Sequence, residues 1–213
     1  MKPHPRVDEV LQFWFGAPAV SFPEHVAKMQ RWFRGGPELD AEATSRFAQT
    51  VDDAIAGKLD GWLDHPKGWL ALVIVLDQLT RNVLRNSPRM YEGDARAQAL
   101  AIDGLDSGRT HALPLAERHF AVMPLVHSEQ LAHQERGVIE LARLVDDAPA
   151  ELRPIYAMGI EQTTKYRAII TRFGRFPHRN AILGRPSTPE ETEFLRDWAT
   201  KQPPSGAAKL MGG

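Results

Sequence analysis

The residues best suited to chemistry lie in one segment near the carboxyl end, RFGRFPHRNAILGR at residues 172–185. From residue 162 to residue 189 the chain has lysine and arginine but no aspartate or glutamate, although the whole chain carries a net charge of only −1. Arginine suits carboxylate and phosphate groups because its planar guanidinium can donate two parallel hydrogen bonds. We therefore predict an anion site in this segment. The residues expected to form it are Arg175, His178, Arg179 and Asn180.

The same arginines have a structural alternative. Like charges held in one turn repel each other, so they need an opposite charge from a ligand or from acids elsewhere in the chain. Arginines can also bind the last carbonyl groups of a helix and pair with the acids of neighbouring helices. We expect these roles above all of Arg167 and Arg185. Gly174 and Pro177 make a continued helix unfavourable, so residues 175–180 are predicted to form a turn.

A second group of polar side chains occurs in the run DQLTRN at residues 77–82. At 100° per residue, four of its members share one arc of a helix. They are Asp77, Gln78, Arg81 and Asn82. The preceding turns are apolar on every side, so the helix is expected to be buried and its polar groups must find partners. Asp77 and Arg81 can pair across one turn. A ligand-facing site and an internal polar network are both consistent with this pattern.

Histidines form the third group, His119, His127 and His133, with Glu129 between the last two. Their spacing differs from the His-Glu-x-x-His motif of zinc proteases. Zinc deaminases need a Cys-x-x-Cys partner, and this chain has no cysteine. We therefore expect no bound metal. Pro124 is expected to restart a helix, which would place His127 near a helix N-terminus that favours anions and would put Glu129 and His133 on one helix face. His127 and His178 are the candidates for acid–base catalysis.

Composition narrows the classes of function. Without cysteine there are no disulfides, thiolate nucleophiles or iron–sulfur clusters, and no cofactor is indicated. The near-neutral charge disfavours a general binder of nucleic acid or membranes. Asp8 and Glu9 interrupt the N-terminal region, so no signal peptide is expected. The longest apolar run, residues 69–76, is far shorter than the ~20 residues that span a bilayer. We expect a cytoplasmic protein.

Helical periodicity dominates the whole chain. We expect an all-α fold of about eight to ten helices, with residues 1–200 as a single domain and residues 201–213 as a disordered tail. Residues 69–84 are predicted to be helical because their apolar positions continue beyond the length of a normal strand. Asp40 is expected to cap the third helix. Thr188 and Glu191 are expected to form the capping box of the last one.

Several of these motifs resemble a bacterial family known as domain of unknown function 924. They are VLQFWFG near the start, DQLTRN at residues 77–82, the segment around HFAVMPLVHSEQ, and RFGRFPHRNAILGRPSTPEE near the end. The resemblance covers nearly the whole chain, and the last motif is the most specific. It implies a helical fold similar to tetratricopeptide-repeat superhelices, a stack of antiparallel helix pairs. It implies no known activity.

Two classes of function remain open. In the first, the basic turn closes one end of a pocket whose other walls are the DQLTRN helix and residues 119–133, and this pocket binds a small anionic ligand and can be catalytic. In the second, a superhelical groove binds a peptide or protein partner, and the basic segment is purely structural.

Overall fold

The computed structural model describes residues 4–19 and 21–200, and every regular element within them is helical. The α-helices are α1 (Pro5–Phe15), α2 (Phe22–Arg34), α3 (Pro37–Ile55), α4 (Pro66–Ile74), α5 (Thr80–Val83), α6 (Asp94–Asp106), α7 (Leu115–Val126), α8 (Leu131–Asp147), α9 (Arg153–Phe173) and α10 (Pro189–Thr200). A π-helical turn, Val75–Leu79, joins α4 to α5 without a break, so the described residues hold nine continuous α-helices. The all-α prediction is confirmed. The predicted tail, residues 201–213, lies outside the described residues.

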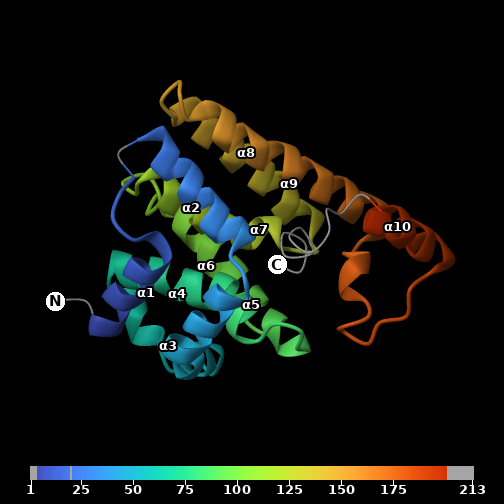
Figure 1. The fold of residues 1–213 in the computed structure, drawn as a ribbon, viewed down its shortest axis with the longest axis horizontal. Helices are drawn as coiled ribbons and strands as arrows, with labels where there is room; N and C mark the ends of the chain where they lie inside the picture. Colours follow the sequence, from blue (N-terminus) through green and yellow to red (C-terminus); the bar gives the residue numbers. More distant parts are fainter. Residues whose placement is uncertain (1–3, 20, 201–213) are drawn as a thin grey trace.

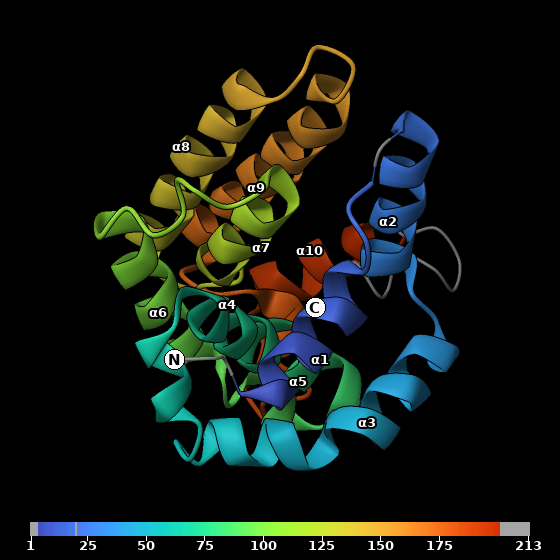
Figure 2. The same ribbon diagram turned by 90° about the vertical axis from the view of Figure 1, so that its left-hand side faces the viewer.

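The second half of the chain packs in sequence order. α6 lies on α7, α7 on α8, and α8 on α9. Figure 1 shows α8 and α9 side by side and antiparallel. In the first half, α1 contacts α4, and α3 contacts the π-helical turn and α5 (Figure 2). This order is what stacked helix pairs require, while a true tetratricopeptide-like superhelix stays a prediction.

The α4 helix lies at the centre of the molecule. All its residues from Gly68 to Ile74 are buried, and the neighbouring helices α1, α6 and α7 contact it. A helix that is apolar on every side must be surrounded by other elements. Its Val-Ile-Val run has a β-preference, but burial against helices on several sides outweighs that weak preference. The helix predicted for residues 69–84 is therefore confirmed.

Two predictions about helix ends are wrong. The α3 helix begins at Pro37 with Gly36 at its N-cap, because proline is favoured in the first turn of a helix. Asp40 instead accepts hydrogen bonds from Asn82 and Arg85, which fixes α3 to the end of α5.

Pro124 likewise does not restart a helix but lies inside α7, which continues to Val126. The α7 residues around it are buried, so their packing outweighs the hydrogen bond that proline cannot donate. His127 is consequently at the C-terminal end of α7, and Glu129 lies in the short connection before α8. The predicted helix N-terminus at His127, and the predicted helix face shared by Glu129 and His133, are both wrong.

Candidate functional site

A buried pair of Asp77 and His127 forms the centre of the site. Asp77 comes from the π-helical turn and is 1% exposed, and His127 ends α7 and is 6% exposed. The Oδ1 atom of Asp77 lies 2.8 Å from Nδ1 of His127. Turns of π-helix are rare and occur frequently at functional sites. This turn is what places a carboxylate from an otherwise apolar helix against the end of α7.

The protonation of the pair follows from its surroundings. Burial disfavours the charged form of Asp77, but the neighbouring His127 and Arg81 outweigh it and lower the pKa of this carboxyl. Burial lowers the pKa of His127, and Arg81 lowers it further against the opposing effect of Asp77. Asp77 is therefore ionised and His127 neutral, with its Nδ1–H donated to the carboxylate and its Nε2 left as an acceptor.

Two buried arginines surround this pair and share a second carboxylate. Arg81 lies 3.4 Å from Asp77 Oδ1 and 2.8 Å from Asp94 Oδ1, and it also donates to the backbone carbonyl of Asp77. Arg179 lies 3.4 Å from Asp94 Oδ2 and donates to the backbone carbonyl of His127 at 2.8 Å. We call Asp77, Arg81, Asp94, His127 and Arg179 the polar cluster. It connects the α4–α5 helix, α6, α7 and the 3-10 turn Pro177–Arg179.

The polar cluster reaches the surface at Tyr91. The guanidinium carbons of Arg81 and Arg179 lie 5.7 and 4.6 Å from the centre of the Tyr91 ring. This ring is half-buried in the 3-10 turn Pro88–Tyr91, and burial raises the pKa of its hydroxyl. Cation–π contacts of this kind fix the planes of both guanidinium groups.

Three nitrogen atoms in the polar cluster have no hydrogen-bond partner among the residues that the structure describes. Nε of Arg81 and Nε of Arg179 are buried donors without an acceptor. His127 uses only Nδ1, so its Nε2 is also unpartnered. Buried polar groups in native proteins are nearly always hydrogen-bonded to protein, water or ligand. The two guanidinium nitrogens are such exceptions, and together with His127 Nε2 they are free to form a further hydrogen bond.

The charges of the polar cluster cancel. Two arginines face two aspartates, and the histidine is neutral. The site therefore has no excess positive charge with which to hold a multiply charged anion. It still has hydrogen-bond donors that are not used by any residue that the structure describes.

The basic segment also has internal acidic partners. Arg175 binds Glu191 through two nitrogens, at 2.6 and 2.8 Å. Arg185 binds Glu129 in the same way, at 2.7 and 2.9 Å, as its predicted structural role requires. Arg172 pairs with Glu190 on the surface. The acids missing from residues 162–189 are thus supplied from α6, α10 and the α7–α8 connection. Arg167, for which a structural pairing was also expected, has no carboxylate partner in the described ranges.

Other predicted site residues support this segment. Glu129 accepts the backbone N–H of Phe176 at 2.8 Å, which ties the turn to the end of α7. Asn180 donates to Ser187 and to Glu191. Glu191 also accepts the N–H of Thr188, and Thr188 accepts the N–H of Glu191 in return, so the predicted capping box is confirmed.

Several predicted residues lie apart from the Asp77–His127 pair. Asn82 binds Asp40 on α3. Gln78, by contrast, donates directly to Asp77 at 2.6 Å. His178 stacks on Trp198, and burial together with Arg179 lowers its pKa to about 3. His133 contacts Ser128 Oγ at 2.9 Å. In the described part of the chain, no group of three or more histidines and acids is arranged to hold a metal ion.

Sequence reasoning missed two members of the site. Asp94 stands in the first turn of α6, where an acid is expected simply because it complements the helix dipole. Tyr91 lies in a short turn with no periodic pattern. Only the fold places Asp94 between two arginines that are far apart in the sequence.

Comparison with known proteins places the chain in one group. A family model described as a bacterial protein of unknown function (DUF924) matches residues 10–198. A solved structure of a protein of unknown function from Agrobacterium tumefaciens is similar over 90% of this chain and 97% of that one, with 31% sequence identity and a TM-score of 0.74. No curated protein matches. No helix within the described ranges is both long and apolar enough to cross a membrane.

Proposed function

The chain belongs to the DUF924 family of bacterial proteins, whose description carries no activity, so we propose a function from the geometry of the polar cluster. The polar cluster binds a small ligand that carries one carboxylate or a similar oxyanion. His127 serves as the acid–base group that acts on this ligand.

The observation that carries the proposal is the set of unpartnered atoms. Arg81 Nε and Arg179 Nε are buried donors, and each unsatisfied buried group costs about 1–3 kcal/mol. An oxyanion placed between them would supply acceptors to both. The bound ligand would thus recover hydrogen-bond energy that the free protein lacks.

The charge of the ligand follows from the charge of the site. Because the two arginines already face Asp77 and Asp94, a monoanion adds one uncompensated charge, whereas a phosphate dianion adds two in a buried place. A monocarboxylate is therefore favoured over phosphate or sulfate.

The chemistry assigned to His127 rests on its hydrogen bond. An imidazole that donates Nδ1–H to a carboxylate presents its Nε2 lone pair as a proton acceptor. Asp77 would hold this tautomer and stabilise the imidazolium formed when a proton is taken. Because the pKa of His127 is lowered, the residue is in its basic form at neutral pH.

Thermal unfolding in the presence of different anions tests the proposal. At constant ionic strength set with chloride, formate, acetate and propionate should raise the midpoint saturably, and phosphate and sulfate should raise it less. Arg179→Gln should remove the carboxylate effect. Arg172→Gln is the matched control, since Arg172 lies in the same segment but pairs with Glu190 on the surface. Equal responses of the two variants, or no response of the parent protein, would contradict the proposal.

A peptide-binding groove is the alternative function. Such a groove needs exposed apolar side chains, and those of the described residues lie on three different helices: Phe22 on α2, Leu131 and Ile139 on α8, and Met158 on α9. The anion experiment separates the two cases, because a peptide groove gives no carboxylate effect that depends on Arg179.

A further inference from the structure

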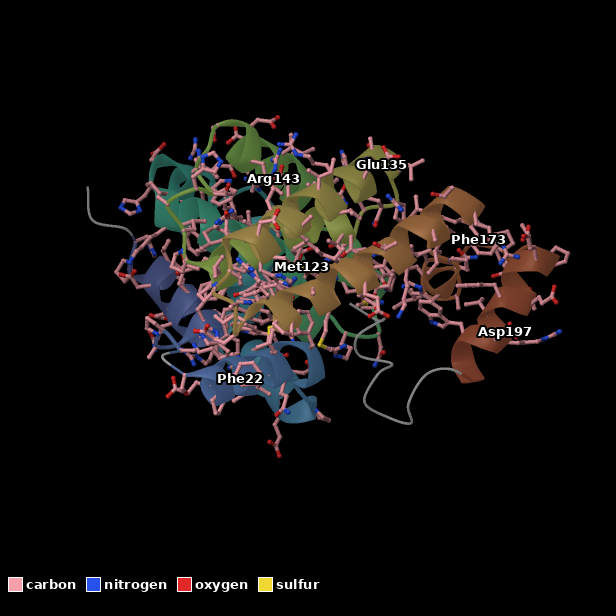
Figure 3. The ribbon with its side chains drawn as sticks, turned by 90° about the horizontal axis from the view of Figure 1, so that it is seen from above. Phe22, Met123, Glu135, Arg143, Phe173 and Asp197 are labelled. Atoms are coloured by element: carbon pink, nitrogen blue, oxygen red, sulfur yellow. The ribbon has the colours of Figure 1, made fainter. Side chains whose placement is uncertain are left out.

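A second place that could hold a ligand is a pocket of about 410 Å³, which shares no residue with the polar cluster. Its walls come from the end of α6, from the connection between α6 and α7, from α7 and from α8. Figure 3 shows Arg143 on α8 next to that connection. The volume falls within the ~300–1,000 Å³ of typical small-molecule sites.

The base of this pocket is apolar and its rim is charged. Leu105, Val122 and Leu144 line the pocket, and the last two are almost fully buried. Two cations and two anions line it as well: Arg118, Arg143, Glu140 and Asp147. These four charges cancel, so the pocket selects neither a pure anion nor a pure cation.

The acidic and the basic side chains of this pocket both have atoms that make no hydrogen bond within the described residues. Both arginine bonds to Glu140, from Arg136 at 2.6 Å and from Arg143 at 2.8 Å, fall on its Oε1 atom. Its Oε2 has no partner among the described residues, although the side chain is only 9% exposed. Oε2 is therefore free to accept a hydrogen bond from a bound molecule, and an ammonium group is a suitable donor.

The arginines of the pocket also have hydrogen-bond donors that are not used in the described part of the chain. Arg118 binds Asp147 through Nη2 alone, at 2.7 Å, so its other nitrogens remain available. The hydroxyl of Thr110, a residue only 4% exposed, makes no hydrogen bond to any residue in the described ranges. A carboxylate would match the free guanidinium donors, and the hydroxyl can serve either end of a ligand.

We infer that this pocket binds a small zwitterion, an amino acid with an apolar side chain. Its ammonium group binds Glu140 Oε2, its carboxylate binds Arg118 and Arg143, and its side chain covers the apolar base. This inference is independent of the function proposed for the polar cluster, because no residue of that cluster lines the pocket.

Isothermal titration calorimetry of the full chain with leucine and two matched analogues tests the inference. Isocaproate lacks the amino group of leucine and isoamylamine lacks its carboxylate. We expect leucine to bind, and each analogue to bind about 10- to 100-fold more weakly, the scale of one lost charge-assisted hydrogen bond. Isocaproate or isoamylamine binding as tightly as leucine would overturn the inference, and so would no heat from leucine up to about 10 mM.

A matched pair of variants checks that the heat comes from this pocket. Arg136 and Arg143 both bind Glu140 Oε1, but only Arg143 lines the pocket. Arg143→Gln should weaken leucine binding about tenfold or more, whereas Arg136→Gln should leave it unchanged. Equal losses in both variants would overturn the assignment to this pocket. Leucine binding that persists in Arg179→Gln would separate this site from the polar cluster.

Discussion

At the scale of single residues, Asp77 needs partners because it is charged and almost fully buried. It is a buried carboxylate with three partners, His127, Arg81 and Gln78. Breaking a buried ion pair by removing one partner leaves an uncompensated charge, and this costs far more than losing an exposed pair.

Asp77→Asn should therefore lower the free energy of unfolding by about 3–5 kcal/mol, as measured by urea denaturation. Asp103→Asn is the control, because Asp103 is exposed and lies 3.7 Å from Arg109, and it should change stability by no more than about 0.5 kcal/mol. If both variants lost the same small amount, Asp77 would have no special place in the buried network.

The stability of the fold should depend on pH through His119. It is 3% exposed, and neither ring nitrogen has a hydrogen-bond partner among the described residues. Burial lowers its pKa from 6.5 to about 4. A histidine whose folded pKa is lowered binds its proton more readily in the unfolded state, so folding is opposed as the pH falls.

The stability that neutral His119 allows should be complete above pH 6.5 and should be lost progressively as the pH falls to about 4. Urea denaturation of the parent and of His119→Leu at several pH values measures this. The difference between the two unfolding free energies should change by up to about 3 kcal/mol across that range. A difference that does not vary with pH would show that His119 keeps its usual pKa in the folded protein.

At the scale of elements, the pairing of Arg175 with Glu191 fixes α10 to the turn that follows α9. Phe173 packs against Phe194, and His178 stacks on Trp198, so the charged pair and the aromatic contacts act on the same helix. Glu191 is 2% exposed, whereas Glu190, the partner of Arg172, is mostly exposed.

Arg175→Ala should destabilise the protein by about 1–3 kcal/mol, because it leaves a buried carboxylate without its strongest partner. Arg172→Ala should cost no more than about 1 kcal/mol, as for an exposed ion pair. Amide hydrogen exchange should locate the effect, with faster exchange in α10 for Arg175→Ala alone. Unchanged exchange in α10 would mean that the aromatic contacts suffice to hold this helix.

The sequence predicts most of the helices but not all of their ends. Apolar periodicity identified the helices, and Thr188 with Glu191 identified the start of α10, because these signals are local. The start of α3 and the continuity of α7 through Pro124 depended on competing local and packing effects. The π-helical turn has no periodic signature, so the sequence could place Asp77 only in a helix that lines the same pocket as residues 119–133, and not opposite His127.

At the scale of the whole molecule, the polar cluster exists only in the complete fold. Its members come from the α4–α5 helix, from α6, from the end of α7 and from the turn after α9. The sequence indicated Asp77, Arg81, His127 and Arg179 by their types. Asp94, the carboxylate that faces both arginines, lies in another element, α6. The acids that neutralise the basic segment come from outside residues 162–189, so this segment needs less charge from a ligand than its own composition suggests.

The central claim is that a small monocarboxylate binds between Arg81 and Arg179, and NMR of arginine Nε–H groups tests it most directly. Protein labelled with ¹⁵N in its arginines would be titrated with acetate at constant ionic strength, with the two resonances assigned from Arg81→Lys and Arg179→Lys. We expect both Nε–H resonances to shift saturably with a single Kd, while that of Arg172 stays in place. Shifts in Arg172 alone, or none in Arg81 and Arg179 with acetate, formate or propionate, would contradict the claim and leave the polar cluster a purely structural network.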